Sequence, residues 1–394
     1  MCPVPISDRE RRARLIARHH LGGTAREAHE AVRSVVAFHS TDPATPYLGA
    51  RARVEGLTID DLDRALFEDR TLWRLHAMRR TLFIIPVEDG AIIGAAASRG
   101  VAAIERRRLE GWLSAEMPAK RIPVFLAGLE SRILELLDDG AERLTREITS
   151  EIPELGTEIT VGSGKWTTRC PLSSRLLFLM AMDGRLVRTR PAGSWRSSQY
   201  RWAIADDWFG AAPAPPDPDG ARAELVRRYL TAYGPAMLED IRWWTGWTVK
   251  QIRQAVDRIG AVPVRLDGDE EGLDLPHRLE ERTEPVRFQS VDLLPALDPT
   301  PMGWKRRDWF LGSHGDRLFD RNGNVGPTVW ADGRIVGGWA QRADGDVVFR
   351  LLEDVGKETE EATQREAADL TSWLRGTVVT PRFRTPLEKE LTAK

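Results

Sequence analysis

The chain has 394 residues, a formal net charge of −2 and 29% charged residues. This length exceeds what one hydrophobic core usually holds and suits two to four small domains. The nearly balanced charge excludes a protein whose whole surface coats nucleic acid. No segment approaches the roughly 20 apolar residues of a membrane span, and residues 1–18 lack the apolar core of a signal peptide. We therefore expect a soluble cytoplasmic protein, associated with the nucleoid, that has no membrane partner.

Cysteine and arginine usage narrow the class further. Cys2 and Cys170 are the only cysteines, which excludes a disulfide framework and a cysteine-built zinc site. We expect no metal and no cofactor. Seven lysines leave 50 arginines among the 57 basic residues, and guanidinium groups bind phosphates and guanine edges well. A GC-rich genome would produce the same arginine excess without any binding role.

Three stretches of the chain follow one plan, in which helices precede a two-stranded hairpin. In the first, the expected helices and hairpin lie at residues 8–21, 24–38, 58–69 and 72–86, with Thr58 as a helix cap. A long helix at residues 87–113 follows. In the second, the expected elements lie at residues 124–137, 145–152, 172–182 and 185–202. In the third, they lie at residues 223–232, 237–244, 249–259 and 262–266.

The C-terminal region has a different texture. Short strands and turns begin near residue 286, and an acidic helix is expected at residues 358–374. Residues 211–219, rich in Pro and Ala, are expected to form a linker. The sequence thus predicts an α+β protein with three tandem winged-helix units and a small β-barrel or sheet domain. The expected boundaries are 1–115, 116–210, 220–285 and 286–394.

Four blocks stand out in the sequence: Phe38 to Tyr47, Met78 to Pro86, Leu293 to Asp298 and Val329 to Trp339. In this order they resemble one protein family, the AlkZ-type bacterial DNA glycosylases. The resemblance spans nearly the whole chain. It implies tandem winged helices that clamp duplex DNA and hydrolyse the N-glycosidic bond of N7-alkylated purines. Characterised members carry Q-x-Q or Q-x-D where this chain has His39-Ser40-Thr41, followed by Asp42.

The chemistry that the resemblance implies makes modest demands on side chains. An N7-alkylated purine already carries positive charge, so it leaves without a general acid, and the protein must position water and stabilise an oxocarbenium-like sugar. His39, Thr41 and Asp42 are therefore the predicted catalytic residues. His39 could hold the water or accept its proton, Thr41 could clamp the water more weakly than an amide, and Asp42 could stabilise the developing charge. The alternatives are a histidine bonded to backbone and an Asp-Pro turn.

The predicted DNA contacts come from two hairpins. The hairpin at residues 185–202 carries five arginines and no acidic residue, which favours a phosphate partner. The predicted DNA-binding residues are Arg79, Arg80, Arg185, Arg188, Arg190, Trp195, Arg196 and Arg201. Trp195 is expected at the hairpin tip, where an aromatic ring could wedge base steps apart. A solvated charged face is the alternative for the arginines.

Two functions from different classes remain. One is a monomeric DNA glycosylase that acts on alkylated bases in double-stranded DNA. The other is a non-catalytic winged-helix regulator or damage sensor that keeps the clamp and lacks the chemistry. Winged-helix regulators usually dimerise to read palindromes, whereas three units in one chain already supply several contacts. That geometry favours the glycosylase.

Overall fold

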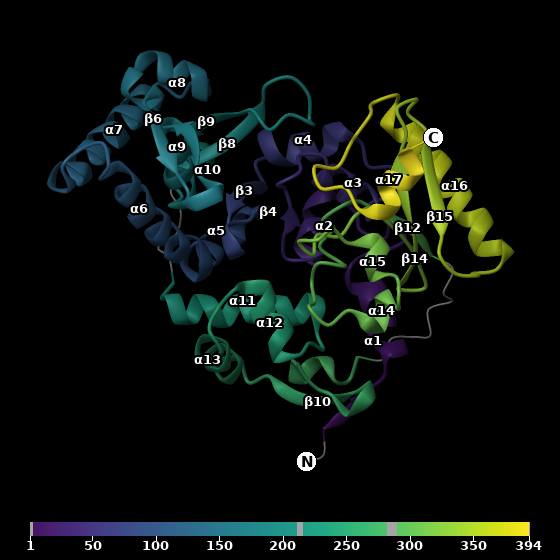
Figure 1. Ribbon diagram of the computed structural model, residues 1–394. Helices are drawn as coiled ribbons and strands as arrows, with labels where there is room; N and C mark the ends of the chain where they lie inside the picture. Colours follow the sequence, from purple (N-terminus) through teal and green to yellow (C-terminus); the bar gives the residue numbers. More distant parts are fainter. Residues whose placement is uncertain (1–2, 211–215, 282–289, 394) are drawn as a thin grey trace.

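The computed structural model describes residues 3–210, 216–281 and 290–393 (Figure 1). Helices and several small sheets alternate along the chain, which gives a mixed α+β fold. Most of the predicted linker at residues 211–219 lies outside the described residues, as do the expected boundary between residues 285 and 286 and Cys2.

The first unit contains four short helices and a three-stranded sheet. Its helices are α1 (Asp8–Arg18), α2 (Ala28–Ser34), α3 (Thr45–Arg51) and α4 (Ile59–Phe67). Its strands are β2 (Phe38–His39), β3 (Leu72–His76) and β4 (Leu82–Pro86), paired in the order β2-β4-β3. Thr58 caps α4 as predicted, because its hydroxyl accepts a hydrogen bond from the Asp61 N–H at 3.2 Å. The helix predicted at residues 24–38 is shorter, since Val36 has a φ of 66° that an α-helix excludes.

The second unit repeats this plan after a nearly continuous helical segment. That segment comprises α5 (Gly90–Ile93), a π-helical turn (Gly94–Ser98) and α6 (Arg99–Leu113). The helices of the unit are α7 (Ile122–Leu137), α8 (Thr145–Glu151), α9 (Leu172–Met182) and α10 (Ala205–Phe209). Its sheet has the order β5-β9-β8, formed by β5 (Arg143–Leu144), β8 (Leu186–Pro191) and β9 (Tyr200–Ile204). A separate hairpin of β6 (Glu158–Val161) and β7 (Thr168–Pro171) was not predicted.

The sheet of the third unit includes a strand from the N-terminal end of the described chain. Its helices are α11 (Pro218–Tyr233), α12 (Leu238–Thr245) and α13 (Val249–Ile259), and its hairpin is β10 (Val262–Leu266) with β11 (Glu271–Asp274). Strand β1 (Val4–Ile6) pairs parallel with β10. Ile6, Val264 and Leu266 form a small buried core there. Burial of these apolar side chains stabilises the pairing of β1 with the sheet of the third unit.

The C-terminal region is an open sheet covered by helices. Strands β12 (Val291–Leu294), β13 (Thr328–Ala331), β14 (Arg334–Gln341) and β15 (Val347–Leu351) pair antiparallel in chain order. The described strands close no barrel, so the sheet alternative of the sequence analysis applies and the barrel does not. Helix α16 (Lys357–Leu374) packs against both edge strands, β12 and β15, and so covers the edges that a barrel would join. Three short helices complete the region: α14 (Asp308–Leu311), α15 (Gly315–Leu318) and α17 (Pro386–Thr392).

The first unit and the C-terminal sheet share a core. Ala44 and Leu48 are buried in the same cluster as Leu293, Val329 and Trp339 of the sheet. Figure 1 shows these two regions as one body, from which the second unit, in blue and teal, and the third unit, in green, project on the same side. The body therefore positions both units relative to each other.

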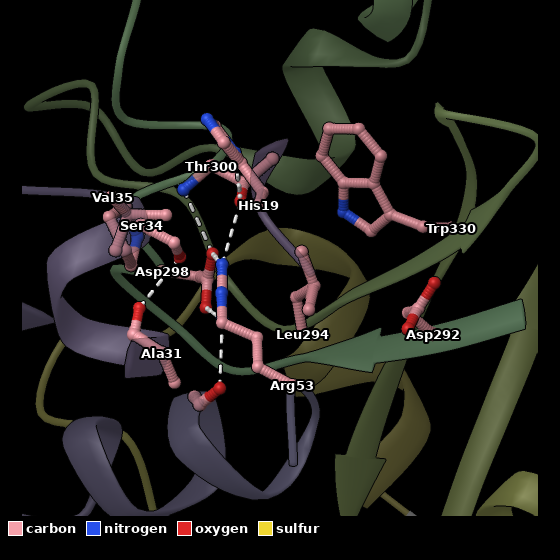
Figure 2. A network of polar contacts seen from close by, with 12 residues as sticks. His19, Ala31, Ser34, Val35, Arg53, Asp292, Leu294, Asp298, Thr300 and Trp330 are labelled. Carbon is pink, nitrogen blue, oxygen red and sulfur yellow. Dashed lines mark hydrogen bonds and ion pairs between the residues drawn. The ribbon is translucent and has the colours of Figure 1, made fainter. Parts of the chain in front are cut away.

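A buried ion pair lies at the junction of this body. Arg53, just after α3, donates from Nη1 to Asp298 Oδ2 at 2.9 Å and from Nη2 to Asp298 Oδ1 at 2.8 Å, and both side chains are fully buried. The same guanidinium donates to the Gly49 carbonyl and to Thr300 Oγ1 (Figure 2). A Cβ at Gly49 would lie 3.3 Å from Asp298 Oδ2, so a larger residue there would press on the carboxylate of the pair.

His19 extends the network to α11. Its Nε2 lies 3.1 Å from the Ala232 carbonyl and so donates to it, and its Nδ1 accepts from the Thr300 hydroxyl at 2.9 Å. Burial lowers the pKa of His19 well below its usual value, and the charge of Arg53 lowers it further. His19 is therefore neutral in the folded protein.

Removing one partner of the ion pair should destabilise the protein strongly. We expect Asp298→Asn to lower the free energy of unfolding by about 3–5 kcal/mol, because it leaves a buried guanidinium unpaired. The double variant Arg53→Met/Asp298→Leu should cost less than this single change. Urea denaturation measures both, with Arg132→Ala, which breaks the exposed pair to Glu154, as a control that should change little. A loss for Asp298→Asn no larger than that of the control would contradict the role of the pair.

The pH dependence of the free energy of unfolding should show that His19 is neutral in the folded protein. Its folded-state pKa is below that of the unfolded chain, so its contribution is complete above about pH 6.5 and is lost as the pH falls. The cost of His19→Gln should therefore be about 1 kcal/mol smaller at pH 5.5 than at pH 7.5. Asp292→Asn is the control with the opposite pH dependence: burial raises the pKa of Asp292 to about 7, so the cost of this variant should be larger at about pH 5.5 than at about pH 7.5. An equal cost of His19→Gln at both pH values would show that His19 is not held neutral.

Candidate functional site

A polar hollow of about 310 Å³ lies where the first and second units meet. Strand β3 of the first unit contacts β8 and α9 of the second there. Hydroxyls and cations dominate the lining: Ser40, Thr41, His76, Arg80, Thr145, Ser173, Ser174, Arg188, Ser198, Tyr200 and Arg382. No carboxylate is among the residues that line it. A neighbouring hollow of about 760 Å³ shares Thr145, Ser173, Arg188, Tyr200 and Trp202 with it and is also lined by Glu158. The name interunit hollow is used here for the 310 Å³ hollow alone.

Two guanidinium groups, Arg188 in the lining of the interunit hollow and Arg74 beside it, form no ion pair among the described residues. Arg188 on β8 lies over the Trp202 ring at 4.6 Å, and its buried Nη1 has no hydrogen-bond partner among the described residues. Burial and the nearby charge of Arg74 lower the pKa of Arg188 to about 9. Arg74 donates from Nε to Ser40 Oγ at 3.1 Å and lies over the Tyr200 ring at 4.5 Å, but its Nη1 is likewise unpaired. Uncompensated cations of this kind are stabilised when an anion arrives.

Further polar atoms around the hollow are also unsatisfied. The buried hydroxyls of Thr189 and Tyr200 and the Nδ1 atom of His76 have no partner among the described residues. Burial, then the charges of Arg188 and Arg80, lower the pKa of His76 to about 2, so its imidazole is neutral at pH 7. A neutral imidazole can accept a hydrogen bond from water. This surface can therefore bind both an anion and a water molecule.

The three predicted catalytic residues do not converge. Thr41 lines the hollow. His39 on β2 does not; its ring lies edge-on to Phe83 at 5.6 Å, and burial, then the charge of Arg79, lower its pKa to about 4. Asp42 is buried, and its Oδ1 and Oδ2 accept hydrogen bonds from the N–H groups of Ala44 at 3.2 Å and Arg382 at 3.0 Å. The carboxylate of Asp42 is thus occupied by backbone, which is the turn alternative of the sequence analysis.

Most arginines of the basic hairpin have partners within the protein. Arg185 pairs with Glu130 at 2.9 Å, Arg201 with Glu147 at 3.8 Å, and Arg190 with Asp63 and Glu68. Arg196 donates to the Val378 carbonyl. Only Arg188 among the five hairpin arginines lines the interunit hollow. DNA contact by the others remains a prediction.

Trp195 does not form a free hairpin tip. Its ring is half-buried and contacts Tyr47 at 5.1 Å and Trp373 at 6.2 Å. Trp195 lies in the β8–β9 loop, and apolar burial docks this loop on the first unit and on α16. The wedging role of Trp195 stays a prediction. Wedging of base steps by Trp195 would require this contact to open.

Arg79 and Arg80 occupy the tight turn (Met78–Arg80) between β3 and β4. Their φ values are 54° and 64°, a left-handed conformation that costs a non-glycine residue roughly 1 kcal/mol or more. Arg79 lies 4.8 Å over the Trp243 ring of α12. Arg80 reaches the opposite way to Glu105 of α6 at 2.8 Å and also lines the interunit hollow. Strain retained at such a turn is typical of functional positions.

Several residues of the hollow were given no role by the sequence. They are Ser40, His76, Ser173, Tyr200 and Arg382; Arg74 and Thr189 lie beside the hollow as buried residues with unpaired polar atoms. Strand alternation does place Arg74 and His76 on one face of β3, opposite the buried Leu75. The contributions from α9, β8, β9 and the C-terminal segment depend on tertiary packing, for which the sequence carries no local signal.

A larger cavity of about 920 Å³ lies between α1, α2 and α11. It mixes arginines such as Arg33 and Arg227 with carboxylates such as Glu30, Glu224 and Glu281, and so differs in charge from the interunit hollow. Within the described ranges, no group of three or more His, Cys, Asp or Glu side chains could hold a metal. No described helix is long and apolar enough to cross a membrane.

Comparison with known proteins identifies the family. The family described as DNA glycosylase AlkZ-like matches residues 32–373. An interstrand DNA cross-link repair glycosylase of Streptomyces sahachiroi is 25% identical over 183 residues, which are 45% of this chain, and the matched part spans about half (49%) of that relative. The solved structure of Streptomyces sahachiroi DNA glycosylase AlkZ has a TM-score of 0.71 at 20% identity, covering 96% of this chain and 99% of the other. The chain belongs to the AlkZ-like DNA glycosylase family.

Proposed function

We propose that this protein is a DNA glycosylase that hydrolyses the N-glycosidic bond of N7-alkylated purines in duplex DNA, with the interunit hollow as its site. The observation that carries the proposal is the Arg188 guanidinium, which has no ion-pair partner among the described residues and lines a hollow without a lining carboxylate, with the unpaired Arg74 bonded to the lining residue Ser40. DNA phosphates are the anions that such groups complement. We further propose that the three helix-and-sheet units are winged helices and that the protein acts as a monomer.

The hollow can meet the demands of this reaction. The cationic purine needs no general acid, so the protein must hold a water molecule near C1′ and bind the flanking backbone. Thr41 and the neutral His76 are the lining groups that can position water by donating and accepting hydrogen bonds. The guanidinium of Arg188 would bind a phosphate beside the lesion. His39 and Asp42 do not line this hollow, and a direct catalytic role for either remains a prediction.

The second candidate function is that of a DNA-binding protein that does not hydrolyse the N-glycosidic bond. The observation in its favour is that only Thr41 of the predicted catalytic residues lines the hollow. A hydroxyl has one donor and its acceptor lone pairs on a single oxygen, whereas a side-chain amide has two donors and an acceptor on two separate atoms and so can hold water more firmly. A damage sensor would keep the cationic hollow and bind the lesion without releasing the base.

Single-turnover release of 7-methylguanine from a methylated duplex tests the proposal. We expect the wild-type protein to release the base, and the isosteric Thr41→Val variant to be slower on the order of 100-fold, because it cannot hold the water. Thr167→Val, at an exposed hydroxyl bonded to the Gly164 carbonyl and outside the hollow, is a matched control that should retain the rate.

Three outcomes separate the accounts. Equal rates for wild type and Thr41→Val would remove Thr41 from the site. A collapse in His39→Ala with Thr41→Val unaffected would move the chemistry to His39. Salt-sensitive duplex binding without release by wild type would support the non-catalytic alternative for this lesion.

A further inference from the structure

The chain after α16 returns to the candidate site as an extended strap. We define the strap as residues 377–383, between the end of α16 and α17. The region matched by the AlkZ-like family ends at residue 373, so the family assignment assigns nothing to this segment. The strap nevertheless supplies one of the cations that line the interunit hollow, Arg382.

Two buried side chains hold the strap in place. Gln341 at the end of β14 donates from Nε2 to the Thr377 carbonyl at 3.0 Å and accepts from the Val379 N–H at 2.7 Å. Asp42 accepts from the Arg382 N–H at 3.0 Å. The Asp42 and Gln341 side chains are each 8% exposed, so these are persistent bonds in a low-dielectric environment.

The side chain of Arg382 is free. It is exposed, and no hydrogen bond or ion pair of its guanidinium is present among the described residues. Its neighbour Arg384 differs, since it pairs with Glu388 at 2.9 Å. Asp42 thus fixes the backbone of Arg382 while the guanidinium remains available at the hollow, near Ser40 and Thr41.

We propose that Arg382 binds a phosphate of the DNA strand that enters the interunit hollow, and that Asp42 is a positioning residue that acts through the backbone N–H of Arg382. This inference rests on the proposed function, because it takes the hollow as the DNA site. It gives the carboxylate of Asp42 a role without contact to the sugar.

Substitution of Asp42 distinguishes positioning from simple electrostatics. Loss of a negative charge near DNA should strengthen binding if charge alone matters. In Asp42→Asn, the single amide oxygen can accept from only one of the two N–H groups of Ala44 and Arg382, and the amide NH₂ opposes the other, donor against donor. The strap account therefore predicts weaker binding, despite the gain of one unit of positive charge.

The experiment measures the affinity of the full chain for a duplex that contains a tetrahydrofuran abasic analogue, as a function of salt concentration. Binding needs no glycosylase activity. Arg382→Gln should reduce the log–log salt slope by about 0.9, the value for one phosphate contact. Asp42→Asn should reduce it equally, and the double variant should lose no more than either single variant. Arg321→Gln, at an exposed arginine that does not line the hollow, controls for the loss of one positive charge.

The outcomes separate failure of this inference from failure of the proposed function. A slope for Arg382→Gln equal to that of Arg321→Gln, or additive losses in the double variant, would overturn the inference. An unchanged slope for Asp42→Asn with abolished 7-methylguanine release would instead make Asp42 catalytic. Arg188→Gln reports on the hollow itself: a reduced slope there with none in Arg382→Gln leaves the proposed function standing, whereas no change in either removes the hollow as the DNA site. Arg382 is exposed, so its variant tests the inference even if Asp42→Asn unfolds.

Discussion

The buried Arg53–Asp298 ion pair is the constraint on which the rest of the structure depends. It joins the end of α3 to the loop after β12, and through Thr300 and His19 it also reaches α11 of the third unit. A buried pair of this kind contributes little net stability but specifies one arrangement, because alternative packings would leave its charges unpaired. It thereby fixes the first unit on the C-terminal sheet. Residues 40–42 lie between β2 and α3, so this junction also positions them.

Charge pairing explains how a protein with 50 arginines can have a net charge of −2 and still offer a cationic site. Arg185, Arg190 and Arg201 are each neutralised by a nearby carboxylate. Arg74 and Arg188 are not, and burial makes that state costly in the absence of a ligand. The distribution of carboxylates, more than the number of arginines, therefore distinguishes the interunit hollow from the rest of the surface and from the larger cavity beside α11.

Local sequence signals predicted the bounds of helices well where a clear apolar stripe or a capping residue defines them. Residues 172–182 and 249–259 form helices with the expected bounds, since an apolar stripe and, at Thr248, a capping box define them. The failures have non-local causes. The pairing of β1 with β10 joins the N-terminal residues to a strand far along the chain, and the open C-terminal sheet is decided by how α16 covers its edges.

The candidate site was predictable only in part, for the same reason. Thr41, Arg80 and Arg188 were predicted from motif and charge, and all three line the hollow. Asp42 and Trp195 were also predicted as site residues from their residue types. Their partners in the structure come from the strap and from α16, and no local sequence pattern links these segments to them. His76 and Tyr200 have functional potential only because tertiary packing buries them without partners.

The most direct test of the central claim is the structure of the protein bound to a duplex with a tetrahydrofuran abasic analogue. Our account predicts the abasic sugar beside Thr41 and a flanking phosphate within hydrogen-bond distance of the Arg188 guanidinium. A duplex seated instead on the cavity between α1, α2 and α11, with the interunit hollow unoccupied, would contradict it.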